Sequence, residues 1–320
     1  MADECIRDEN APLTHCQSKQ KFNIKAKAKI PRELRSILNP EPKPYKLTEI
    51  DPNKLDKKLA NETNPIKPML PDWFDVTDSP LKSKLPKPAR VLLNGKDLQP
   101  LTVFGADDRQ IYNDTSYPWG SICRVATSAG AGSGVIVGPR HVLTASHVVD
   151  WTSGGAGTVE VHRAGGFTRA TAAITNVWYY TRISGRINWS ELDEDYAVLV
   201  TDQRIGDLFG WMGTRTYDSG WDDEPYWWNI GYPGARGGGI RPTFQRDKAL
   251  DEPWYDSGPA RSMKTLADLT PGNSGGPMFG FWDEGPFVVA VVSAQDQDNN
   301  WCSGGRWLTN LVSHAISQDP

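Results

Sequence analysis

The sequence has no long apolar run, no excess of positive charge and few cysteines. Its longest strongly apolar run is FVVAVV at 287–292, far short of the roughly 18 apolar residues that cross a membrane as a helix. The formal net charge of −4 at pH 7 excludes the strongly basic footprint of a nucleic-acid-binding protein. The four cysteines have no spacing typical of a zinc site. We therefore expect no membrane partner, no nucleic-acid partner and no bound metal.

Glycine and tryptophan are almost absent from the first 102 residues, which hold one of each, Gly95 and Trp73. Fifteen of the 17 lysines lie there, and this segment carries a net charge of +5 against −9 for residues 103–320. Its prolines and lysines cluster in LNPEPKPYK, NPIKPMLPDW and LKSKLPKPARV, a composition typical of linkers. We therefore expect residues 1–102 to be a partly disordered N-terminal extension or pro-segment, and residues 103–320 to be the folded body. For residues 19–70 a disordered basic tail is an equal alternative.

The N-terminal stretch MADECIRDEN lacks the apolar run of a signal peptide. The cysteines divide evenly, with Cys5 and Cys16 in the extension and Cys123 and Cys302 in the body. This division suits two disulfides formed in an oxidising compartment, with free thiols in a reducing cell as the alternative. We expect a secreted protein whose signal peptide is not part of this sequence.

The body has the pattern of an all-β protein. Short runs rich in branched and aromatic residues are separated by Gly, Asp and Pro clusters: SGVIVG, TVEVH, ITNVWYY, YAVLV and FVVAVV. Near the C-terminus, LTNLVSHAIS has a helical spacing of apolar positions, at Leu308, Leu311, Val312 and Ala315. The aromatic segment at 210–232 is expected to pack inside the protein, with stacking on a substrate as the alternative. We therefore expect a sandwich or barrel of strands followed by a C-terminal helix.

The stretch DLTPGNSGGPMF, residues 268–279, places Ser274 among glycines and prolines that suit neither a helix nor a regular strand. Such a turn can point several backbone N–H groups at one spot beside a reactive hydroxyl, which is the arrangement of a nucleophile with its oxyanion hole. A plain surface turn has the same composition. A catalytic serine also needs a base, and the base needs a group that orients it.

His147 is the best candidate for that base, because the apolar strand HVLTA ends just before it in small residues. The other four histidines are expected to be structural or solvated: His15, His141, His162 and His314. Asp195 stands immediately before the apolar run YAVLV and is the candidate orienting carboxylate. Asp193 and Glu194 are then expected to face solvent.

Three segments in the order His, Asp, Ser, namely LTASHVV, DYAVLV and GNSGGP, resemble those of the chymotrypsin-like serine peptidases. The resemblance is strongest to the V8-like glutamyl endopeptidase branch. VFGADDRQIYNDTSYPWGSICRV is similar to the mature N-terminus of that branch, and NIGYPGARGG to its Gly-Tyr-Pro-Gly loop. The resemblance covers residues 103–318 and leaves the extension unmatched.

The resemblance implies two antiparallel six-stranded β-barrels with the catalytic groups at their junction. It assigns Ser274 as nucleophile, His147 as general base and then acid, and Asp195 as the residue that orients the imidazole. The N–H groups of Gly272 and Ser274 would form the oxyanion hole. This covalent chemistry needs no cofactor.

The sequence departs from its relatives around the substrate pocket. Asn273 stands where pancreatic-type enzymes have an aspartate that pairs with a newly cut N-terminal amine. Val292 and Leu269 stand where the glutamyl branch has a histidine and a threonine that bind the substrate carboxylate. An apolar pair would not offset the desolvation of that carboxylate, so the resemblance does not extend to cleavage after Glu. Asp268 stands where trypsin-like enzymes bind Lys or Arg, and an apolar pocket is the alternative.

These observations predict a monomeric serine endopeptidase that acts on polypeptides. Its substrate-binding residues are expected to be Asp268, Leu269, Val292, Ser293 and Gln295. We expect a proenzyme that an activating protease cuts between Leu98 and Phe104. The alternative is a catalytically latent or silent binding protein of the same fold.

Overall fold

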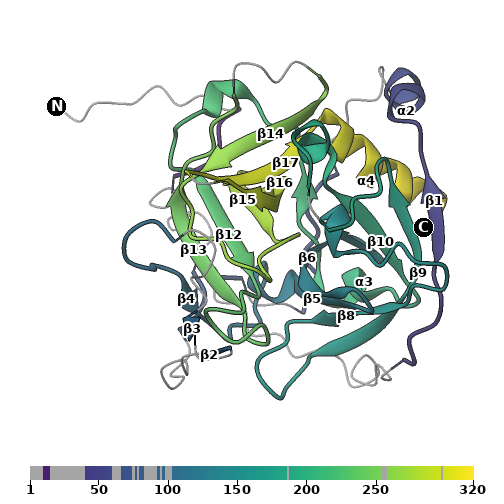
Figure 1. The fold of residues 1–320 in the computed structure, drawn as a ribbon, viewed down its shortest axis with the longest axis horizontal. Coiled ribbons are helices and arrows are strands. Elements are labelled where there is room, and N and C mark those ends of the chain that lie inside the picture. The colour runs from purple at the N-terminus through teal and green to yellow at the C-terminus, as the bar shows by residue number, and fades with distance from the viewer. Residues whose placement is uncertain are drawn as a thin grey trace.

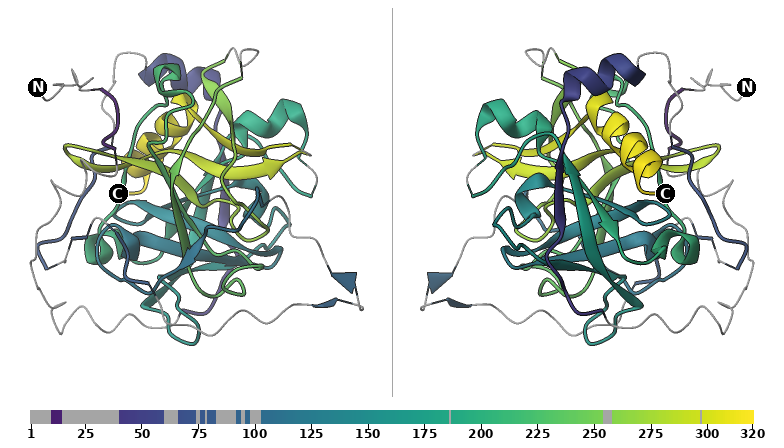
Figure 2. Two further views of the ribbon diagram at one scale, coloured as in Figure 1. Left: turned by 90° about the vertical axis from the view of Figure 1, so that its left-hand side faces the viewer. Right: turned by 90° about the vertical axis from the view of Figure 1, so that its right-hand side faces the viewer.

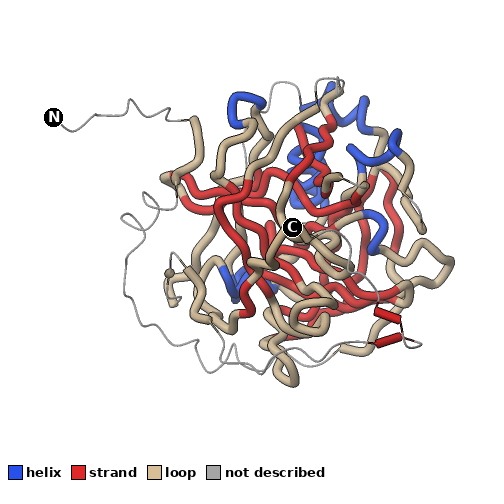
Figure 3. The backbone as a smooth tube through the Cα atoms, turned by 60° about the vertical axis from the view of Figure 1, so that its left-hand side comes forward, coloured by secondary structure: helices blue, strands red, loops and turns tan. Residues whose placement is uncertain are grey.

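The computed structural model describes residues 10–14, 40–59, 66–73, 76–77, 79–82, 92–93, 96–97, 103–185, 187–253, 258–296 and 298–320. Two sheets lie side by side and form the body of the molecule (Figure 1). Strands fill its interior and the helices lie at its edges (Figure 3). No helix in the described ranges is long and apolar enough to cross a membrane.

The first sheet contains a closed barrel of six antiparallel strands. The sheet order is β1-β9-β10-β7-β6-β5-β8, and the additional pairing of β8 with β9 closes the ring. The barrel strands are β5 (Ile122–Thr127), β6 (Gly130–Gly138), β7 (His141–Thr144), β8 (Gly157–Val161), β9 (Ala170–Tyr179) and β10 (Ala197–Thr201). They contain four of the apolar runs expected to be strands, because branched side chains pack well on a pleated surface.

The second sheet has eight strands in the order β14-β17-β16-β15-β12-β13-β4, with β11 paired to β16. The strands are β4 (Gln110–Ile111), β11 (Gly213–Thr214), β12 (Trp227–Gly231), β13 (Thr243–Lys248), β14 (Ala260–Thr265), β15 (Pro277–Trp282), β16 (Gly285–Gln295) and β17 (Asn300–Gly305). The all-β prediction is confirmed. The described strand pairs close the first barrel and leave the second sheet open between β14 and β4.

The predicted C-terminal helix is α4 (Arg306–Gln318). Its buried residues are the four expected from the helical spacing, Leu308, Leu311, Val312 and Ala315. They join an apolar cluster that includes Trp119 and residues of both sheets. The expected burial of the aromatic segment is also confirmed, because Trp221, Trp227 and Trp228 are at most 5% exposed. Three further strands and two further helices are short: β1 (Lys46–Glu49), β2 (Leu92–Leu93), β3 (Lys96–Asp97), α2 (Pro52–Leu59) and α3 (Ile205–Phe209).

Part of the extension packs on the body. Strand β1 pairs with β9 in parallel along the outer edge of the barrel, and α2 lies against α4 (Figures 1 and 2). The hydroxyl of Tyr45 donates to the backbone oxygen of Asp150 at 2.7 Å, and Leu55 on α2 is 4% exposed. Residues 40–59 therefore form ordered structure, although the sequence left a disordered tail equally open for this region.

The predicted disulfide between the body cysteines is wrong. Cys123 lies on β5 in the first barrel and Cys302 on β17 in the second sheet, and both are free thiols. They belong to separate apolar clusters, so the fold holds them apart. Burial raises the pKa of both thiols well above the usual range, which keeps them protonated and unreactive. Cys5 and Cys16 lie outside the described residues.

Candidate active site

His147 and Asp195 meet at one end of the first barrel. His147 lies on a short 3-10 helix, Ser146–Val148, just after β7, and Asp195 lies just before β10. In the β7–β10 pair, Thr144 stands opposite Ala197, so the chain segments beyond these two residues leave the sheet at the same end. There Nδ1 of His147 lies 2.7 Å from Oδ2 of Asp195.

The carboxylate of Asp195 is fully buried and has three donors. Oδ1 accepts the backbone N–H of His147 at 3.0 Å, and Oδ2 accepts the hydroxyl of Ser293 at 2.5 Å as well as the imidazole contact. A carboxylate acceptor beside Nδ1 favours the tautomer with its proton on Nδ1, which leaves Nε2 as the acceptor of the ring. Asp193 and Glu194 are only half-buried, and the structure brings neither of them to His147.

The turn around Ser274 has a distinctive pattern of backbone hydrogen bonds. The N–H groups of Asn273, Gly275 and Gly276 donate to backbone oxygens at 2.8–2.9 Å. Those of Gly272 and Ser274 have no acceptor in the described part of the chain. Unpaired backbone donors are rare in folded proteins, so this pair is a notable feature of the turn. The two N–H groups are available to an incoming oxygen.

The peptide before Gly272 has a fixed direction. The oxygen of Pro271 accepts the N–H of Gly234 at 2.8 Å, and in a trans peptide the following N–H points to the opposite side. Gly272 has φ +98°, and a Cβ there would collide with the carbonyl oxygen of Tyr232. Glycine at 272 is therefore required for the orientation of this N–H group.

Ser133 on β6 also holds the turn around Ser274 in place, a role that the sequence did not reveal. Its hydroxyl donates to the oxygen of Gly272 at 2.6 Å and accepts the N–H of Tyr232 at 2.8 Å. The backbone N–H of Ser133 also donates to the oxygen of Ser274 at 2.7 Å. The first barrel therefore holds the turn of the second sheet directly, through one side chain and one backbone group.

A cleft of about 1070 Å³ contains these groups. His147, Ser274 and Gly272 line it together with Ser293 and Gln295, two of the predicted substrate-binding residues. The hydroxyl of Ser274 has no hydrogen bond to the described residues. A proton transfer from this hydroxyl to His147 would require the two groups to lie about 2.6–3.2 Å apart.

The apolar part of the cleft includes Ile187, Trp189, Leu192 and Trp301. Trp189 is 63% exposed and its ring stands edge-on to that of the buried Trp301, with centroids 5.3 Å apart. Aromatic pairs of this kind present a rigid apolar surface. This part of the cleft therefore suits apolar groups.

The other predicted substrate-binding residues are placed elsewhere. Asp268, Leu269 and Val292 are at most 4% exposed and are not among the described residues that line the cleft. The carboxylate of Asp268 accepts the backbone N–H groups of Phe104 and Asp108, each at 2.9 Å. Burial raises the pKa of Asp268 above its usual range. Leu269 and Val292 pack in an apolar cluster of the second sheet.

The other histidines lie away from this pair. His141 and His162 are fully buried, and the ring of His314 stands edge-on to that of Trp178. His15 lies outside the described residues. None of the three described histidines lines the cleft.

Residues 132–288 match the trypsin-like peptidase domain family. The glutamyl endopeptidase of Bacillus licheniformis is 29% identical over 190 residues, which cover 56% of this chain and 54% of that protein. The chain therefore spans about half the length of this curated relative. A solved structure of a Glu endopeptidase in complex with MPD is 21% identical and covers 68% of this chain and 100% of its own, with a TM-score of 0.56. The protease Anisep from Arthrobacter nicotinovorans is 17% identical and covers 66% of this chain and 99% of its own, with a TM-score of 0.51.

Proposed function

We propose that this chain, whose residues 132–288 match the trypsin-like peptidase domain family, is a serine endopeptidase acting through His147, Asp195 and Ser274. One observation carries the proposal. A cleft holds a histidine paired to a buried carboxylate, a serine, and two backbone donors, at Gly272 and Ser274, that have no acceptor among the described residues. Each group has a defined task in acyl transfer, and the histidine, the carboxylate and the serine come from three separate segments of the chain.

In the first half of the reaction, Ser274 Oγ attacks the carbonyl carbon of the peptide bond while Nε2 of His147 takes the hydroxyl proton. The carbonyl oxygen becomes an oxyanion and accepts the N–H groups of Gly272 and Ser274. Asp195 stabilises the imidazolium that forms. Collapse of the intermediate breaks the C–N bond, and His147 gives its proton to the leaving amine.

In the second half, water replaces the amine. His147 takes a proton from the water as the hydroxide attacks the acyl ester on Ser274, and the same two N–H groups bind the second oxyanion. Collapse releases the carboxylic acid and returns the proton to Ser274 Oγ. These steps use only groups of this chain and of the substrate, with no cofactor.

We propose polypeptides with apolar side chains as substrates. The carboxylate of Asp268 already holds two backbone N–H groups, so it is not available to a Lys or Arg side chain. Leu269 and Val292 are buried outside the cleft and offer no polar group to a Glu side chain, although two of the similar proteins are glutamyl endopeptidases. Trp189 and Trp301 support an apolar subsite beside the catalytic groups.

We further propose that the protein is secreted, monomeric and made as a proenzyme, cut between Leu98 and Phe104 by an activating protease. The change of charge and glycine content near residue 102 supports this boundary. The described residues of the extension do not line the cleft. Trimming is therefore proposed to act on the access of long polypeptides rather than on the catalytic groups.

The test compares peptide hydrolysis by the intact chain, by the chain trimmed near residue 103 and by Ser274→Ala, on a library varied on both sides of the bond. We expect cleavage next to apolar residues by the trimmed wild type and none by Ser274→Ala. A stable, correctly folded wild type that cleaves nothing in either form would instead identify a silent binding protein of this fold.

A further inference from the structure

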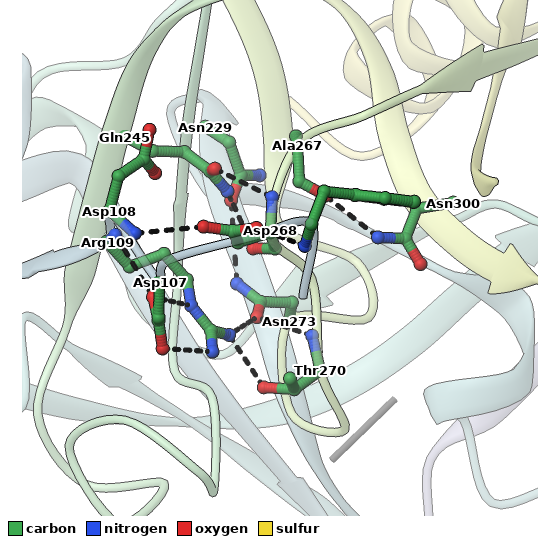
Figure 4. A network of polar contacts seen from close by, with 11 residues as sticks. Asp107, Asp108, Arg109, Asn229, Gln245, Ala267, Asp268, Thr270, Asn273 and Asn300 are labelled. Carbon is green, nitrogen blue, oxygen red and sulfur yellow. Dashed lines mark hydrogen bonds and ion pairs between the residues drawn. The ribbon is translucent and has the colours of Figure 1, made fainter. Parts of the chain in front are cut away.

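Arg109 is a buried cation next to the catalytic turn, and the proposed mechanism does not use it. It lies just before β4 and is 1% exposed. Its Nε and Nη2 donate to the carboxylate of Asp107 at 3.0 and 2.8 Å. Its Nη1 donates to the hydroxyl of Thr270 at 2.7 Å and to Oδ1 of Asn273 at 3.1 Å (Figure 4). A buried guanidinium is tolerated when its donors are satisfied in this way.

Asn273 connects this cation to the oxyanion donors. It stands between Gly272 and Ser274 in the chain, and its Oδ1 also accepts the N–H of Thr270 at 3.1 Å. Arginine donates and never accepts, so the contact with Arg109 determines which end of the Asn273 amide faces the guanidinium. The orientation of the residue between the two oxyanion donors is therefore set by Arg109 and Thr270.

A second connection runs parallel to the first. Asp268 accepts the N–H groups of Phe104 and Asp108, and its own backbone exchanges two hydrogen bonds with the Gln245 side chain, at 2.8 and 2.9 Å. Segment 104–109 is thus joined to segment 268–273 at both ends, through Phe104 and Arg109. Figure 4 shows the contacts that Asp108 and Arg109 make. The two segments form one polar network next to Ser274 in the chain, with Arg109 as its buried cation.

We infer that Arg109 is a positioning residue that holds the turn of Ser274 in its reactive form before any cleavage of the chain. In the pancreatic-type enzymes that the sequence resembles, a new N-terminal amine supplies the cation beside the nucleophile, and an aspartate receives it. Here an internal guanidinium reaches the neutral Asn273, and no new chain end is needed. This inference rests on the proposed peptidase function.

The geometry of the uncut chain agrees with this role. Pro271 directs its oxygen to Gly234, and the N–H groups of Gly272 and Ser274 have no acceptor in the described part of the chain. Residues 104–109 are present in the intact chain and in a chain trimmed between Leu98 and Phe104. Trimming therefore leaves Arg109 and its contacts in place.

The experiment measures kcat and KM on a short peptide ester, the rate of acylation by a small fluorophosphonate, and the thermal midpoint, for wild type and Arg109→Met. We expect kcat and the acylation rate of Arg109→Met to fall on the order of 100-fold, as when an oxyanion donor is lost, with KM within about threefold. Arg109→Lys should recover part of kcat, because it retains the charge but not the fork that holds several acceptors.

Arg124→Met is the matched control. Arg124 is a partly buried arginine paired with Glu160 at 3.0 Å, and it is not among the residues that line the cleft. We expect its kcat to match wild type. If Arg109→Met is unfolded, Asn273→Ala tests the same contact from the other side while the Arg109–Asp107 pair stays intact, and the same fall in kcat is expected.

Wild-type kcat in a folded Arg109→Met or Asn273→Ala variant would overturn the inference, as would a rise in KM with kcat unchanged. An intact chain that reacts with the small fluorophosphonate much more slowly than the trimmed chain would also overturn it. These failures differ from failure of the proposed function, in which the wild type itself neither cleaves peptides nor reacts at Ser274.

Discussion

Ser293 and His147 contact the same oxygen of Asp195, from the second sheet and the first barrel respectively. The buried carboxylate of Asp195 therefore connects the first barrel to the second sheet. Ser293→Ala would remove one donor to this buried carboxylate, which should lower the free energy of unfolding by about 1–2 kcal/mol. We expect kcat to fall on the order of tenfold and the thermal midpoint to fall by about 2–8 °C. Unchanged kcat would show that the two remaining contacts suffice.

Asp195→Asn should leave the fold intact and reduce kcat on the order of ten-thousandfold, because the imidazole would lose the acceptor that fixes its tautomer. Asp193→Asn is the control, since Asp193 is half-buried and makes no contact with His147 in the described structure. We expect it to retain activity within about threefold. Steady-state kinetics on one peptide substrate decide the matter, and the reverse ranking of the two variants would refute the choice of carboxylate.

The extension should remain bound after the chain is cut near residue 103. Strand β1 and helix α2 pack on the body, and Leu55 is buried beside α4. We expect both fragments to elute together in size-exclusion chromatography after limited proteolysis. Leu55→Asp would bury an unpaired charge and cost on the order of 3 kcal/mol, which should release the extension. Asn53→Asp, at an exposed position of the same helix, should not. Separate elution of the wild-type fragments would contradict the packing.

Two buried histidines predict loss of stability in acid. Burial lowers the pKa of His141 and of His162 to about 4, from an ordinary value of 6.5. The unfolded chain binds protons at these sites below pH 6.5 and the folded chain does not. The contribution of these neutral histidines to the free energy of unfolding is therefore complete above pH 6.5. It is lost as pH falls toward 4, by about 3 kcal/mol for each histidine.

His141→Gln should reduce this loss, because glutamine does not titrate. The measurement is urea unfolding of wild type and variant at pH 7, 5.5 and 4.5. We expect the variant to lose less stability than the wild type between the first and the last pH. Equal losses in the two proteins would show that His141 carries a proton in the folded state.

Much of the fold could be predicted from local patterns. The apolar runs of β6, β8, β9, β10 and β16 and the buried face of α4 follow from side-chain periodicity, which a chain expresses locally. The pairing of His147 with Asp195 was proposed from ordered motifs. Each motif places its residue at the end of a strand, and the pairing of β7 with β10 brings the two together.

The long-range contacts that hold the site in place could not be predicted from local patterns. Arg109 contacts Asn273 across 164 positions of sequence, and within GADDR it has the pattern of an ordinary solvated charge. Asp268 stands where trypsin-like enzymes have the aspartate that binds a Lys or Arg side chain. Its carboxylate here accepts backbone N–H groups from a distant segment, Phe104 and Asp108, which local pattern does not reveal. The even number of body cysteines suggested a disulfide. Whether the two thiols can meet depends instead on the tertiary fold, which places Cys123 in the first barrel and Cys302 in the second sheet. Such contacts are set by tertiary structure, which local pattern does not contain.

The most direct test of the account is the site of covalent reaction with a fluorophosphonate, found by mass spectrometry of the digested protein. We predict one equivalent of label on Ser274 in the wild type, and on the order of a thousandfold slower labelling in His147→Ala, because the base would be missing. A folded wild type that stays unlabelled, or label on another residue at the same rate in Ser274→Ala, would contradict the assignment of this cleft as the active site of a serine peptidase.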